Sequence, residues 1–357
     1  MAYVRALSEL EIQTRVVYFS PDKAHSRVRN SYHHVDFVYM WDRWYIDIPR
    51  LRKISLKLYL RRFVQRLKSG DIVYVYGFPD LVVALSKRND IKIFAERTEF
   101  DGVSFICHVK KITINQFIEA CRIIDGVVVI SQGLRKYYIE SGCQANRVHI
   151  INMIADTTRF TDLQKQQKEP YIAYCGTALN NKDGVDQLIR AFSIVNKSHP
   201  NYKLYIIGST PSKQQRFYNY DLVQELGIEK NVVFTGIVPS TDIPQLLKNA
   251  SILALDRPNN LQAKYGFPTK LGEYLLTANP VVITCVGDIP LFLKDGESAL
   301  VSEPDDPQSF AEKLCWAIEH PHKAEEIGKK GKQVAELCFN YMTETRKLIN
   351  IINRNRL

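Results

Sequence analysis

Two hydrophobic patterns alternate along the chain. Short, nearly continuous runs of Val, Ile, Leu and Tyr are bounded by polar residues or glycine, which is typical of strands buried on both faces. These runs predict strands at 14–19, 71–76, 91–95, 126–130, 148–151, 171–175, 203–207, 232–234, 251–255 and 281–284. Between the strands we expect helices at 3–10, 116–124, 132–141, 184–197, 221–226, 242–249, 288–293 and from 306 onward. The alternation predicts parallel sheets with helices on both faces.

One polar stretch interrupts this alternation. Residues 156–170 carry no hydrophobic period, which indicates a connection between two domains. The length of 357 residues also suits two domains better than one. We therefore predict an α/β protein made of two doubly wound, Rossmann-like domains facing across a cleft. The predicted parts are a first domain at 1–157, a linker at 158–169, a second domain at 170–337 and a C-terminal segment at 338–357.

The chain opens on a helical pattern, although a doubly wound domain usually opens on a strand followed by a Gly-rich turn. Two explanations are open. The first strand is absent by design, or the recorded start lies downstream of it, and we favour the second.

Charge and cysteine content narrow the class of protein. The formal net charge of +10 favours anionic partners, namely nucleic acid, anionic lipid or phosphorylated small molecules. Seven widely spaced cysteines without a Cys-x-x-Cys pair indicate small buried side chains in a reducing cytoplasm rather than disulfides or a metal site. The first residues carry no signal-peptide pattern and no apolar run is long enough to span a membrane. We therefore predict a cytoplasmic location.

Three segments of the second domain follow predicted strands, where open α/β sheets bind ligands. The segment 175–184 offers Gly176, which lets a ligand approach the backbone, and Lys182, which suits a phosphate. The segment 233–238 ends a strand whose backbone could meet a flat ring. The segment 264–284 combines a Gly-Phe-Pro turn with a helix start. Each feature taken alone also has a purely structural explanation, whereas the set of three is harder to explain that way.

The helix start in this third segment suits an anion. The backbone N–H groups of Thr269, Lys270 and Leu271 would be free to bind one there. Further along the same predicted helix, Glu273 could accept two hydrogen bonds from a diol such as a ribose.

These residues resemble the donor half of the retaining glycosyltransferases of family 4, which have the GT-B fold. The family pattern, roughly Glu-Gly-Phe-Gly-x-x-x-x-Glu followed by Pro-Val-Val, is similar to Tyr-Gly-Phe-Pro-Thr-Lys-Leu-Gly-Glu at 265–273 and Asn-Pro-Val-Val at 279–282. Further matches are Cys-Gly-Thr at 175–177, Lys-Asp-Gly-Val-Asp at 182–186 and Phe-Thr-Gly at 234–236. The resemblance covers nearly all of the chain after residue 70 and is strongest over 171–305.

The resemblance implies roles for individual residues. Glu273 is expected to hold the ribose, Lys182 the diphosphate, and the backbone at 266–271 the sugar and phosphate, with Val238 beside the base. The predicted catalytic residues are Lys182, Lys270 and Glu273. The remaining predicted donor-binding residues are Gly176, Thr177, Gly208, Val238, Arg257, Tyr265, Gly266, Phe267, Pro268, Thr269 and Leu271. No metal and no cofactor is expected, because the sugar nucleotide is a substrate.

Two positions depart from the family pattern. The first family Glu, which contacts the donor sugar, is Tyr265 here, and the usual Arg after Gly176 is Thr177. Lys270, Arg257 or Lys264 would supply the missing positive charge, with Lys270 preferred. Arg257 and Lys264 fall in a segment that we interpret as a loop, so they could equally be surface residues.

The first domain is expected to bind the acceptor. After the strand at 91–95 come Glu96, Arg97 and Glu99, which are the polar candidates for acceptor contact; an ordinary salt-bridged loop is the alternative. By similarity with related folds, the last helix, at about 339–353, is expected to return to this domain.

A basic helical segment precedes these residues. Residues 50–68 contain eight basic residues and no acid, with Leu56, Leu60, Phe63 and Leu67 on one stripe. Such a helix can lie on an anionic membrane or simply pack on the core with a solvated basic face. If it touches lipid, the acceptor would be lipid-linked or a surface polysaccharide.

The resemblance implies transfer of a sugar from a nucleoside diphosphate sugar to a saccharide or lipid-linked acceptor, with retention and without a metal. Cell-surface polysaccharide or glycoconjugate synthesis is the expected setting, at the inner face of the membrane if the basic helix binds there. Alternatives are another GT-B enzyme, such as a sugar-nucleotide epimerase or an inverting transferase, and a non-catalytic degenerate homologue. A nucleic-acid binder is disfavoured, because no recognised nucleic-acid-binding module is present.

Overall fold

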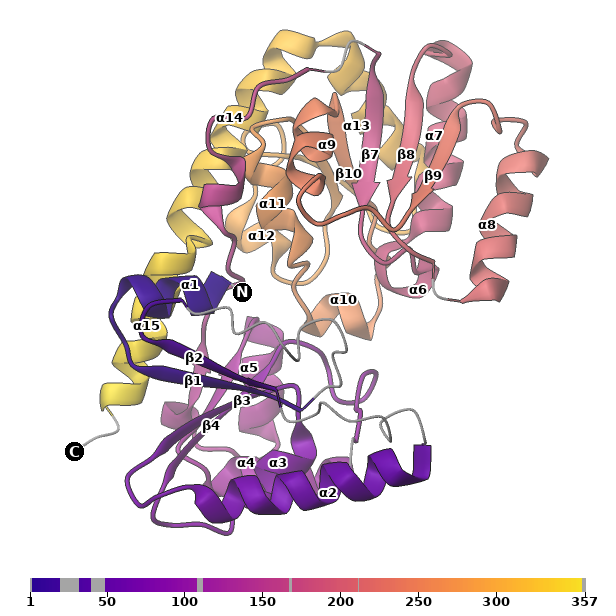
Figure 1. Cartoon of the computed structure of the whole chain (residues 1–357). Helices are drawn as coiled ribbons and strands as arrows, with labels where there is room; N and C mark the ends of the chain where they lie inside the picture. Colours follow the sequence, from indigo (N-terminus) through magenta and orange to yellow (C-terminus); the bar gives the residue numbers. More distant parts are fainter. Residues whose placement is uncertain are drawn as a thin grey trace. The chain divides into compact units, whose positions relative to one another are not determined.

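The computed structural model describes residues 2–19, 32–39, 49–107, 112–166, 169–210 and 212–354 (Figure 1). For Tyr39 and residues 49–53 it describes the backbone alone. Two residues of the predicted linker, 167 and 168, and the end of the C-terminal segment, 355–357, therefore lie outside the described residues, as do the side chains at 50–53 of the basic segment.

The chain divides into two compact units. Unit 1 contains Met1–Asn152 and Tyr341–Leu357, and unit 2 contains Met153–Asn340. The chain therefore leaves unit 1 once and comes back to it for its last helix, α15 (Tyr341–Arg354). Unit 2 begins before the predicted linker, so residues 158–166 belong to the compact second unit rather than to a free connection.

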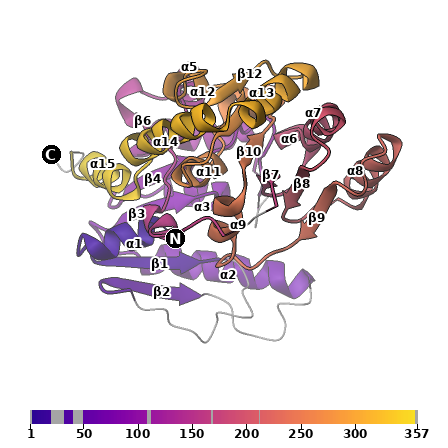
Figure 2. The same ribbon diagram turned by 90° about the horizontal axis from the view of Figure 1, so that it is seen from above.

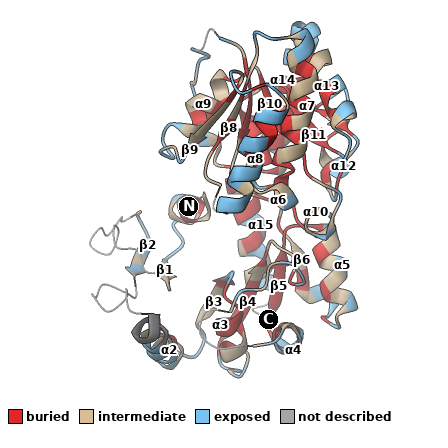
Figure 3. Cartoon of the chain, turned by 90° about the vertical axis from the view of Figure 1, so that its right-hand side faces the viewer, coloured by how far each residue is buried: buried red, intermediate tan, exposed pale blue. Residues whose placement is uncertain are grey.

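Unit 2 is built on a six-stranded parallel sheet in the order β12-β11-β10-β7-β8-β9. Its strands are β7 (Tyr171–Cys175), β8 (Lys203–Ile207), β9 (Val232–Gly236), β10 (Ile252–Leu255), β11 (Val281–Thr284) and β12 (Leu300–Ser302). All residues of β10 and β11 are buried (Figure 3). Their continuous apolar sequences are what a central parallel strand requires, because both of its faces are covered.

Helices cover both faces of this sheet. In Figures 1 and 2, α7, α8 and α13 lie on one face and α9 and α11 on the other. Helices α7 and α13 pack together, and α14 packs on α11. The helices are α6 (Asn180–Asp183), α7 (Val185–Ser198), α8 (Lys213–Glu225), α9 (Ile243–Asn249), α10 (Leu261–Tyr265), α11 (Lys270–Leu276), α12 (Ile289–Phe292), α13 (Pro307–Glu319) and α14 (Pro321–Cys338).

Unit 1 contains a four-stranded parallel sheet in the order β3-β4-β5-β6 and a separate parallel pair, β1 and β2. The strands are β1 (Thr14–Tyr18), β2 (Val35–Tyr39), β3 (Ile72–Tyr76), β4 (Lys92–Arg97), β5 (Gly126–Val129) and β6 (Val148–Ile150). The helices are α1 (Ala2–Glu9), α2 (Pro49–Arg66), α3 (Pro79–Leu85), α4 (Ile114–Ile123), α5 (Gln132–Glu140) and α15.

Helix α15 completes the core of unit 1. Its Leu348 packs with Val128 of β5 and with Ile151, and Tyr3 of α1 packs against the same cluster. Its Glu344, which is buried, accepts a hydrogen bond of 2.9 Å from the backbone N–H of Asn152. The last helix is therefore a structural part of the first unit.

Several elements differ from the predicted pattern. Helix α8 starts at Lys213, eight residues before the predicted start at 221, because its first two turns carry polar and aromatic residues without an apolar period. The segment around Lys264, interpreted as a loop, forms the short helix α10, which Asn260 caps by accepting from Ala263 N–H. Strand β4 extends to Arg97, so Glu96 and Arg97 lie in the strand rather than after it.

Candidate functional site

The carboxyl ends of β7, β8 and β9 meet at three glycines. Gly176 N–H donates to the carbonyl of Ile207 at 2.8 Å, and Gly208 N–H donates to the carbonyl of Gly236 at 3.0 Å. A Cβ atom on Gly208 would lie 2.1 Å from the carbonyl oxygen of Gly176, so only glycine fits this position. The predicted residues Gly176 and Gly208 are therefore neighbours at one edge of the sheet.

A cluster of charged side chains lies beside Gly176. The carboxylate of Asp183, at the end of α6, accepts a hydrogen bond of 2.7 Å from the Tyr174 hydroxyl and forms an ion pair with the Lys270 ammonium. The guanidinium of Arg257 lies 4.0 Å from the same carboxylate. We call Tyr174, Asp183, Arg257 and Lys270 the β7 charge cluster.

The β7 charge cluster holds two cations and one acid. The side chains of Lys270 and Asp183 are 19% and 3% exposed. Burial lowers the pKa of Lys270, and Asp183 opposes this shift by favouring the charged ammonium. Because Arg257 is also buried, the cluster carries a surplus positive charge at a strand end, which suits an anionic ligand.

Close backbone contacts fix this cluster. Gly184 follows Asp183 in the left-handed conformation at φ 57°, and a Cβ there would lie 1.9 Å from the carbonyl oxygen of Asp256. The Arg257 backbone is held by Thr284, whose hydroxyl accepts from Arg257 N–H at 2.9 Å and donates to its carbonyl at 2.8 Å. The ends of α6, β10 and β11 are therefore locked together around Asp183.

Lys182 lies next to this cluster on α6. Its side chain is partly exposed, and its carbonyl accepts a hydrogen bond of 3.4 Å from Arg257 Nε. The structure thus brings Lys182, Arg257 and Lys270 to one region, although they are up to 88 residues apart in the sequence. Lys264, the third candidate for the missing positive charge, is exposed on α10 with its ammonium 5.8 Å from the Tyr265 ring centre.

Glu273 is paired within unit 2. Its carboxylate accepts a hydrogen bond from Arg159, whose guanidinium also donates to the carbonyl of Ser240 at 2.8 Å. Burial raises the pKa of Glu273, and Arg159 opposes this shift. Arg159 sits in a 3₁₀ helix, η3 (Thr157–Phe160), inside the polar stretch predicted to connect the two domains. It joins α11 to the loop after β9, where Val238 lies.

A tyrosine anchors α11 to the end of β7. The Tyr274 hydroxyl accepts a hydrogen bond of 2.6 Å from Cys175 N–H. Tyr274 is fully buried, and Lys270, Glu273 and Tyr274 all belong to the same helix. This bond therefore sets the position of both predicted charged residues relative to Gly176.

The turn before α11 has a mixed structure. Phe267 is buried and packs its ring against Phe292 and Phe339, with ring centres 5.3 and 5.6 Å away. The N–H of Leu271 donates to the Pro268 carbonyl at 3.0 Å, and the Leu271 side chain is buried. Leu271 therefore does not offer the N–H group expected of it. Gly266 and Pro268 are also buried, whereas Thr269 and Thr177 are exposed and Tyr265 is partly exposed.

The candidates in unit 1 behave differently from one another. Arg97 forms a buried ion pair with Asp101, which corrects the expectation that it faces an acceptor from a loop. Glu96 accepts a hydrogen bond of 2.6 Å from the Tyr74 hydroxyl, and burial raises its pKa to about 7. Glu99 is partly exposed. Glu96 and Glu99 thus remain candidates, and Arg97 serves packing.

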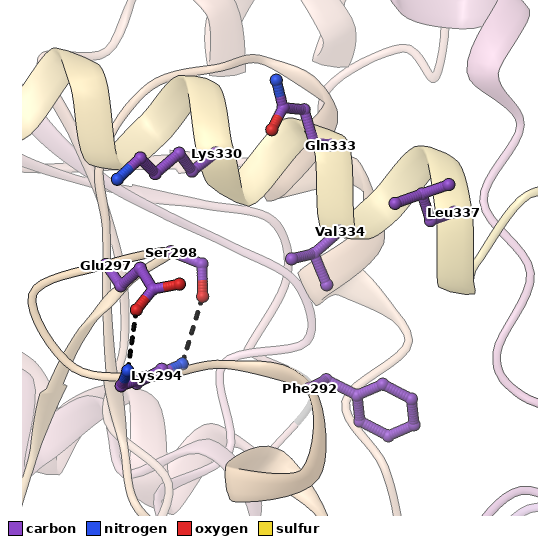
Figure 4. Close-up of a pocket in the computed structure, with 8 residues that line it drawn as sticks. All are labelled: Phe292, Lys294, Glu297, Ser298, Lys330, Gln333, Val334 and Leu337. Carbon is purple, nitrogen blue, oxygen red and sulfur yellow. Dashed lines mark hydrogen bonds and ion pairs between the residues drawn. The ribbon is translucent and has the colours of Figure 1, made fainter.

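A separate pocket of about 380 Å³ lies elsewhere in unit 2 (Figure 4). It is lined by Phe292, Lys294, Glu297, Ser298, Lys330, Gln333, Val334 and Leu337. Among the lining residues, the ammonium of Lys294 pairs with Glu297 at 2.9 Å, and none of the predicted site residues lines the pocket. This pocket is therefore not the predicted donor site.

Two kinds of feature are absent from the part of the chain that the structure describes. Within the described ranges, no three His, Cys, Asp or Glu side chains gather in a way that could hold a metal ion. Among the helices that the structure describes, none combines the length and the apolar character needed to cross a lipid bilayer.

Comparison with known proteins places the chain in a family. Residues 156–334 match the family described as glycosyl transferases group 1, and this region holds all of the β7 charge cluster, Arg159 and Glu273. Because the match spans half of the chain, the protein belongs to the group 1 glycosyltransferase family.

Curated relatives are distant. Mannosylfructose-phosphate synthase of Agrobacterium fabrum is 23% identical over 235 residues, which cover 63% of this chain and 50% of that protein. A GDP-mannose-dependent α-(1-6)-phosphatidylinositol monomannoside mannosyltransferase of Mycolicibacterium smegmatis is 25% identical and covers 56% of this chain and 55% of that protein. The chain thus spans about half the length of these relatives.

Solved structures share the whole fold. The crystal structure of Anabaena Alr3699/HepE in complex with UDP and glucose has a TM-score of 0.77, 15% identity, and covers 99% of this chain and 95% of that one. Sucrose-phosphate synthase from Thermosynechococcus elongatus has a TM-score of 0.76, 17% identity, and covers 99% and 91%. These likenesses confirm the predicted GT-B class of fold with its two Rossmann-like sheets.

Proposed function

We propose that this protein is a glycosyltransferase that moves a sugar from a nucleoside diphosphate sugar to a saccharide or lipid-linked acceptor, with retention and without a metal. The observation that carries the proposal is the β7 charge cluster, in which Lys270 and Arg257 surround one acid inside the group 1 region. A diphosphate is the part of the donor that needs such a surplus of positive charge.

The proposed chemical role of the cluster is electrostatic. When the bond between the sugar and the diphosphate breaks, negative charge develops on the leaving diphosphate. Fixed cations at a site shielded from water stabilise that charge without having to reorganise. Lys270 and Arg257 are fixed by Asp183 and Thr284, and Lys182 adds a further, partly exposed charge from the adjoining helix.

Glu273 is proposed to hold the ribose, as the family pattern implies. Its carboxylate is partly exposed and already accepts one hydrogen bond from Arg159. A carboxylate offers about four lone-pair positions, so a ribose diol can bind while the Arg159 pair persists. Arg159 would then orient Glu273 toward the loop that carries Val238, the proposed neighbour of the base.

The test of the proposal starts with donor binding. Sugar nucleotides, beginning with UDP-glucose and GDP-mannose, would be screened by thermal shift. At least one sugar nucleotide should raise the melting temperature of the protein, because a ligand that binds the folded state stabilises that state. Calorimetry should then show that Glu273→Ala abolishes this binding. Glu297→Ala is the matched control. Glu297 also forms an ion pair, with Lys294, but it lines the separate pocket. Unchanged affinity in Glu273→Ala would contradict the ribose assignment.

The reaction class needs its own measurement. Transfer to an acceptor library should yield a product whose anomeric configuration equals that of the donor, as read by NMR, and should persist in excess chelator. Conversion of the donor to its epimer in the absence of acceptor would instead identify an epimerase. Donor binding without any turnover would identify the degenerate homologue that Tyr265, in the place of the family Glu, keeps open.

The acceptor side of the proposal rests on unit 1. Glu96 lies near the carboxyl end of β4, with a pKa of about 7 that keeps its protonated and charged forms both accessible near neutral pH. Such a group, with Glu99 nearby, suits hydrogen bonds to sugar hydroxyls. A polysaccharide or glycoconjugate product is the proposed outcome, which product analysis by mass spectrometry would test.

We further propose that α2 brings the protein to the inner face of an anionic membrane. Leu56 and Leu60 are buried against unit 1, whereas Ile54 and Leu58 are 57% and 52% exposed. Exposed cationic side chains flank these two aliphatic residues: Lys57, Arg61, Arg62 and Arg66. A helix with no acid, a basic outer face and two outward aliphatic side chains would be attracted to an anionic lipid surface mainly by its charge.

Vesicle binding tests this membrane proposal. Binding to vesicles of phosphatidylcholine with phosphatidylserine should weaken when Arg61, Arg62 and Arg66 are changed to Gln, and should fall with added salt. The Leu58→Asp variant should bind less, whereas Ile123→Asp, at a similarly exposed position on α4, should bind normally. Equal binding of the Leu58 and Ile123 variants would contradict the proposal.

A further inference from the structure

Asp183 lies at the centre of the β7 charge cluster, although it has no assigned role. Its side chain is 3% exposed, and an acid so deeply buried needs charged or hydrogen-bonding partners. It has them on three elements: Tyr174 of β7, Lys270 of α11 and Arg257 after β10. Gly184, which follows it, admits no side chain because of the Asp256 carbonyl. The position of Asp183 is therefore fixed by the backbone as well as by its partners.

The Lys270 ammonium is held in one place by these contacts. It donates to Asp183 and, at 3.0 Å, to the Tyr174 hydroxyl, and it lies 4.5 Å from the centre of the Tyr174 ring. These contacts account for two of its three N–H bonds. A Cβ on Gly176 would lie 2.4 Å from this nitrogen, so the ammonium occupies the space that a side chain at position 176 would take. The third N–H is thus held at the strand end where donor phosphates are proposed to bind.

We propose that Asp183 is a positioning residue that keeps the Lys270 ammonium charged and fixed at the carboxyl end of β7, facing the donor diphosphate. The part of this inference that concerns the donor diphosphate rests on the proposed function. The part that concerns the charge and position of Lys270 does not. Asp183 itself does not touch the donor. Its negative charge also lets Lys270 and Arg257 lie close together, because without it the two cations would repel each other in a buried site.

The protonation state of Lys270 depends on the charged and polar groups around it. The groups that face Lys270 are Tyr174 and Cys175 of β7, Lys182 and Asp183 of α6, and Arg257. Burial, Arg257 and Lys182 all lower the pKa of Lys270, and Asp183 opposes them. Changing Asp183 to Asn removes the opposing charge while nearly keeping the shape, so the pKa of Lys270 should fall and the amine should become neutral at a lower pH.

The first experiment measures the pH at which the Lys270 amine loses its proton, in the absence of any donor. Trace labelling of the folded apo protein with acetic anhydride across a pH series, read by mass spectrometry, gives the midpoint at which the Lys270 amine becomes reactive. The midpoint should shift to lower pH by at least one unit in Asp183→Asn. It should not move in Asp295→Asn, which removes an exposed acid paired with Lys313. Tyr174→Phe, which removes the hydroxyl that accepts a hydrogen bond from the Lys270 ammonium, provides a milder variant and should shift the midpoint in the same direction. An unshifted midpoint in both cluster variants would overturn the proposal.

The second experiment links the charge to the donor. In Asp183→Asn, affinity for UDP-glucose or GDP-mannose, whichever the wild type binds, should fall at least about tenfold between pH 6 and pH 8.5. The double variant Asp183→Asn with Lys270→Arg should lose this pH dependence, because arginine stays charged throughout. A pH dependence that survives in the double variant would overturn the positioning role. If the wild type binds no sugar nucleotide of the thermal-shift screen while the labelling midpoint still shifts, the proposed function fails and the assignment of Asp183 to Lys270 stands.

Discussion

Each unit contains a buried acid that pairs with a cation and accepts a hydrogen bond from a tyrosine hydroxyl. The two sites differ in their net charge. In unit 1, Asp101 pairs with Arg97 and accepts from Tyr138 at 2.5 Å. In unit 2, Asp183 pairs with Lys270 and accepts from Tyr174 at 2.7 Å. The first site balances one cation with one acid, and its two side chains are 8% and 0% exposed. The second has two cations for one acid and leaves Lys270 more accessible.

The difference separates packing from binding. A balanced, fully buried pair has no net charge to offer a ligand, and its value is to hold β4, Asp101 and α5 in one arrangement. A pair with a surplus cation at a strand end is less favourable for the free protein but attracts an anion. The net charge of a buried cluster therefore indicates a binding function better than the presence of an ion pair does.

The largest expected effect is on stability, in the balanced site. Asp101→Ala should lower the free energy of unfolding by about 3–5 kcal/mol, because Arg97 is left buried without its acid. Urea unfolding would measure the change. Glu140→Ala is the control in the same unit, since the pair of Glu140 with Lys136 is exposed and should cost less than about 1 kcal/mol. Equal losses of stability in the two variants would show that the buried Arg97–Asp101 pair contributes no more than an exposed pair.

The next effect is a pH dependence in unit 1. The pKa of Glu96 is raised from 4.5 to about 7 by burial, so between these values the folded protein keeps a proton that the unfolded chain releases. Stability should therefore fall as the pH rises from about 4.5 to about 7 and level off above. Glu96→Gln should remove this slope and be more stable above pH 7 by up to about 3 kcal/mol. Unfolding curves at pH 5 and pH 8 would show it, and parallel slopes in both proteins would contradict the assignment.

A smaller effect tests the surplus cation. Lys270→Ala leaves Asp183 with Arg257 and Tyr174, so it should destabilise the protein less than Arg97→Ala does. Affinity for the donor should nevertheless fall about 10- to 100-fold, the usual range for losing one hydrogen bond to a charged group. Calorimetry and urea unfolding on the same two variants would decide. If the Lys270 variant loses stability but keeps its donor affinity, the β7 charge cluster has a structural role like the Arg97–Asp101 pair and does not bind the donor.

The smallest effect concerns the partly exposed pair in unit 2. Arg159→Ala should lower the free energy of unfolding by less than about 1 kcal/mol, because water screens a pair at this exposure. It should also raise the pKa of Glu273 further, since Arg159 holds that pKa down. Donor affinity measured from pH 5 to pH 8 should therefore weaken at the acidic end relative to the wild type. A pH profile identical to that of the wild type would show that Arg159 does not tune Glu273.

The fold was predictable because its strands are chemically simple. Buried parallel strands such as β10 and β11 read as unbroken apolar runs, and the predicted ranges at 251–255 and 281–284 nearly match them. Helix α10 and the first half of α8 were missed because a short helix and a largely exposed one carry no apolar period. Strand β2 was missed too, and it pairs only with β1 among the described strands.

The candidate site was predictable only in part. Lys182, Lys270 and Glu273 were singled out by motif, and whether they bind a donor stays a prediction. Asp183 stands in the same motif, one residue after Lys182, yet its importance depends on Lys270, 87 residues away. Arg159 meets Glu273 across 114 residues. Pairs so distant in sequence leave no local pattern. The one available signal was the acid itself, placed between a strand end and a glycine.

The return of α15 to unit 1 has a consequence for biosynthesis. Leu348 fills the core beside Val128 and Ile151, and these partners are made about 200 residues earlier. A ribosome delivers residues from the N-terminus onward, so the whole of unit 2 emerges before unit 1 can close. The apolar cluster around Val128 and Ile151 therefore lacks its α15 partner while the second unit is translated. The nascent first unit should therefore expose this cluster until α15 has been made.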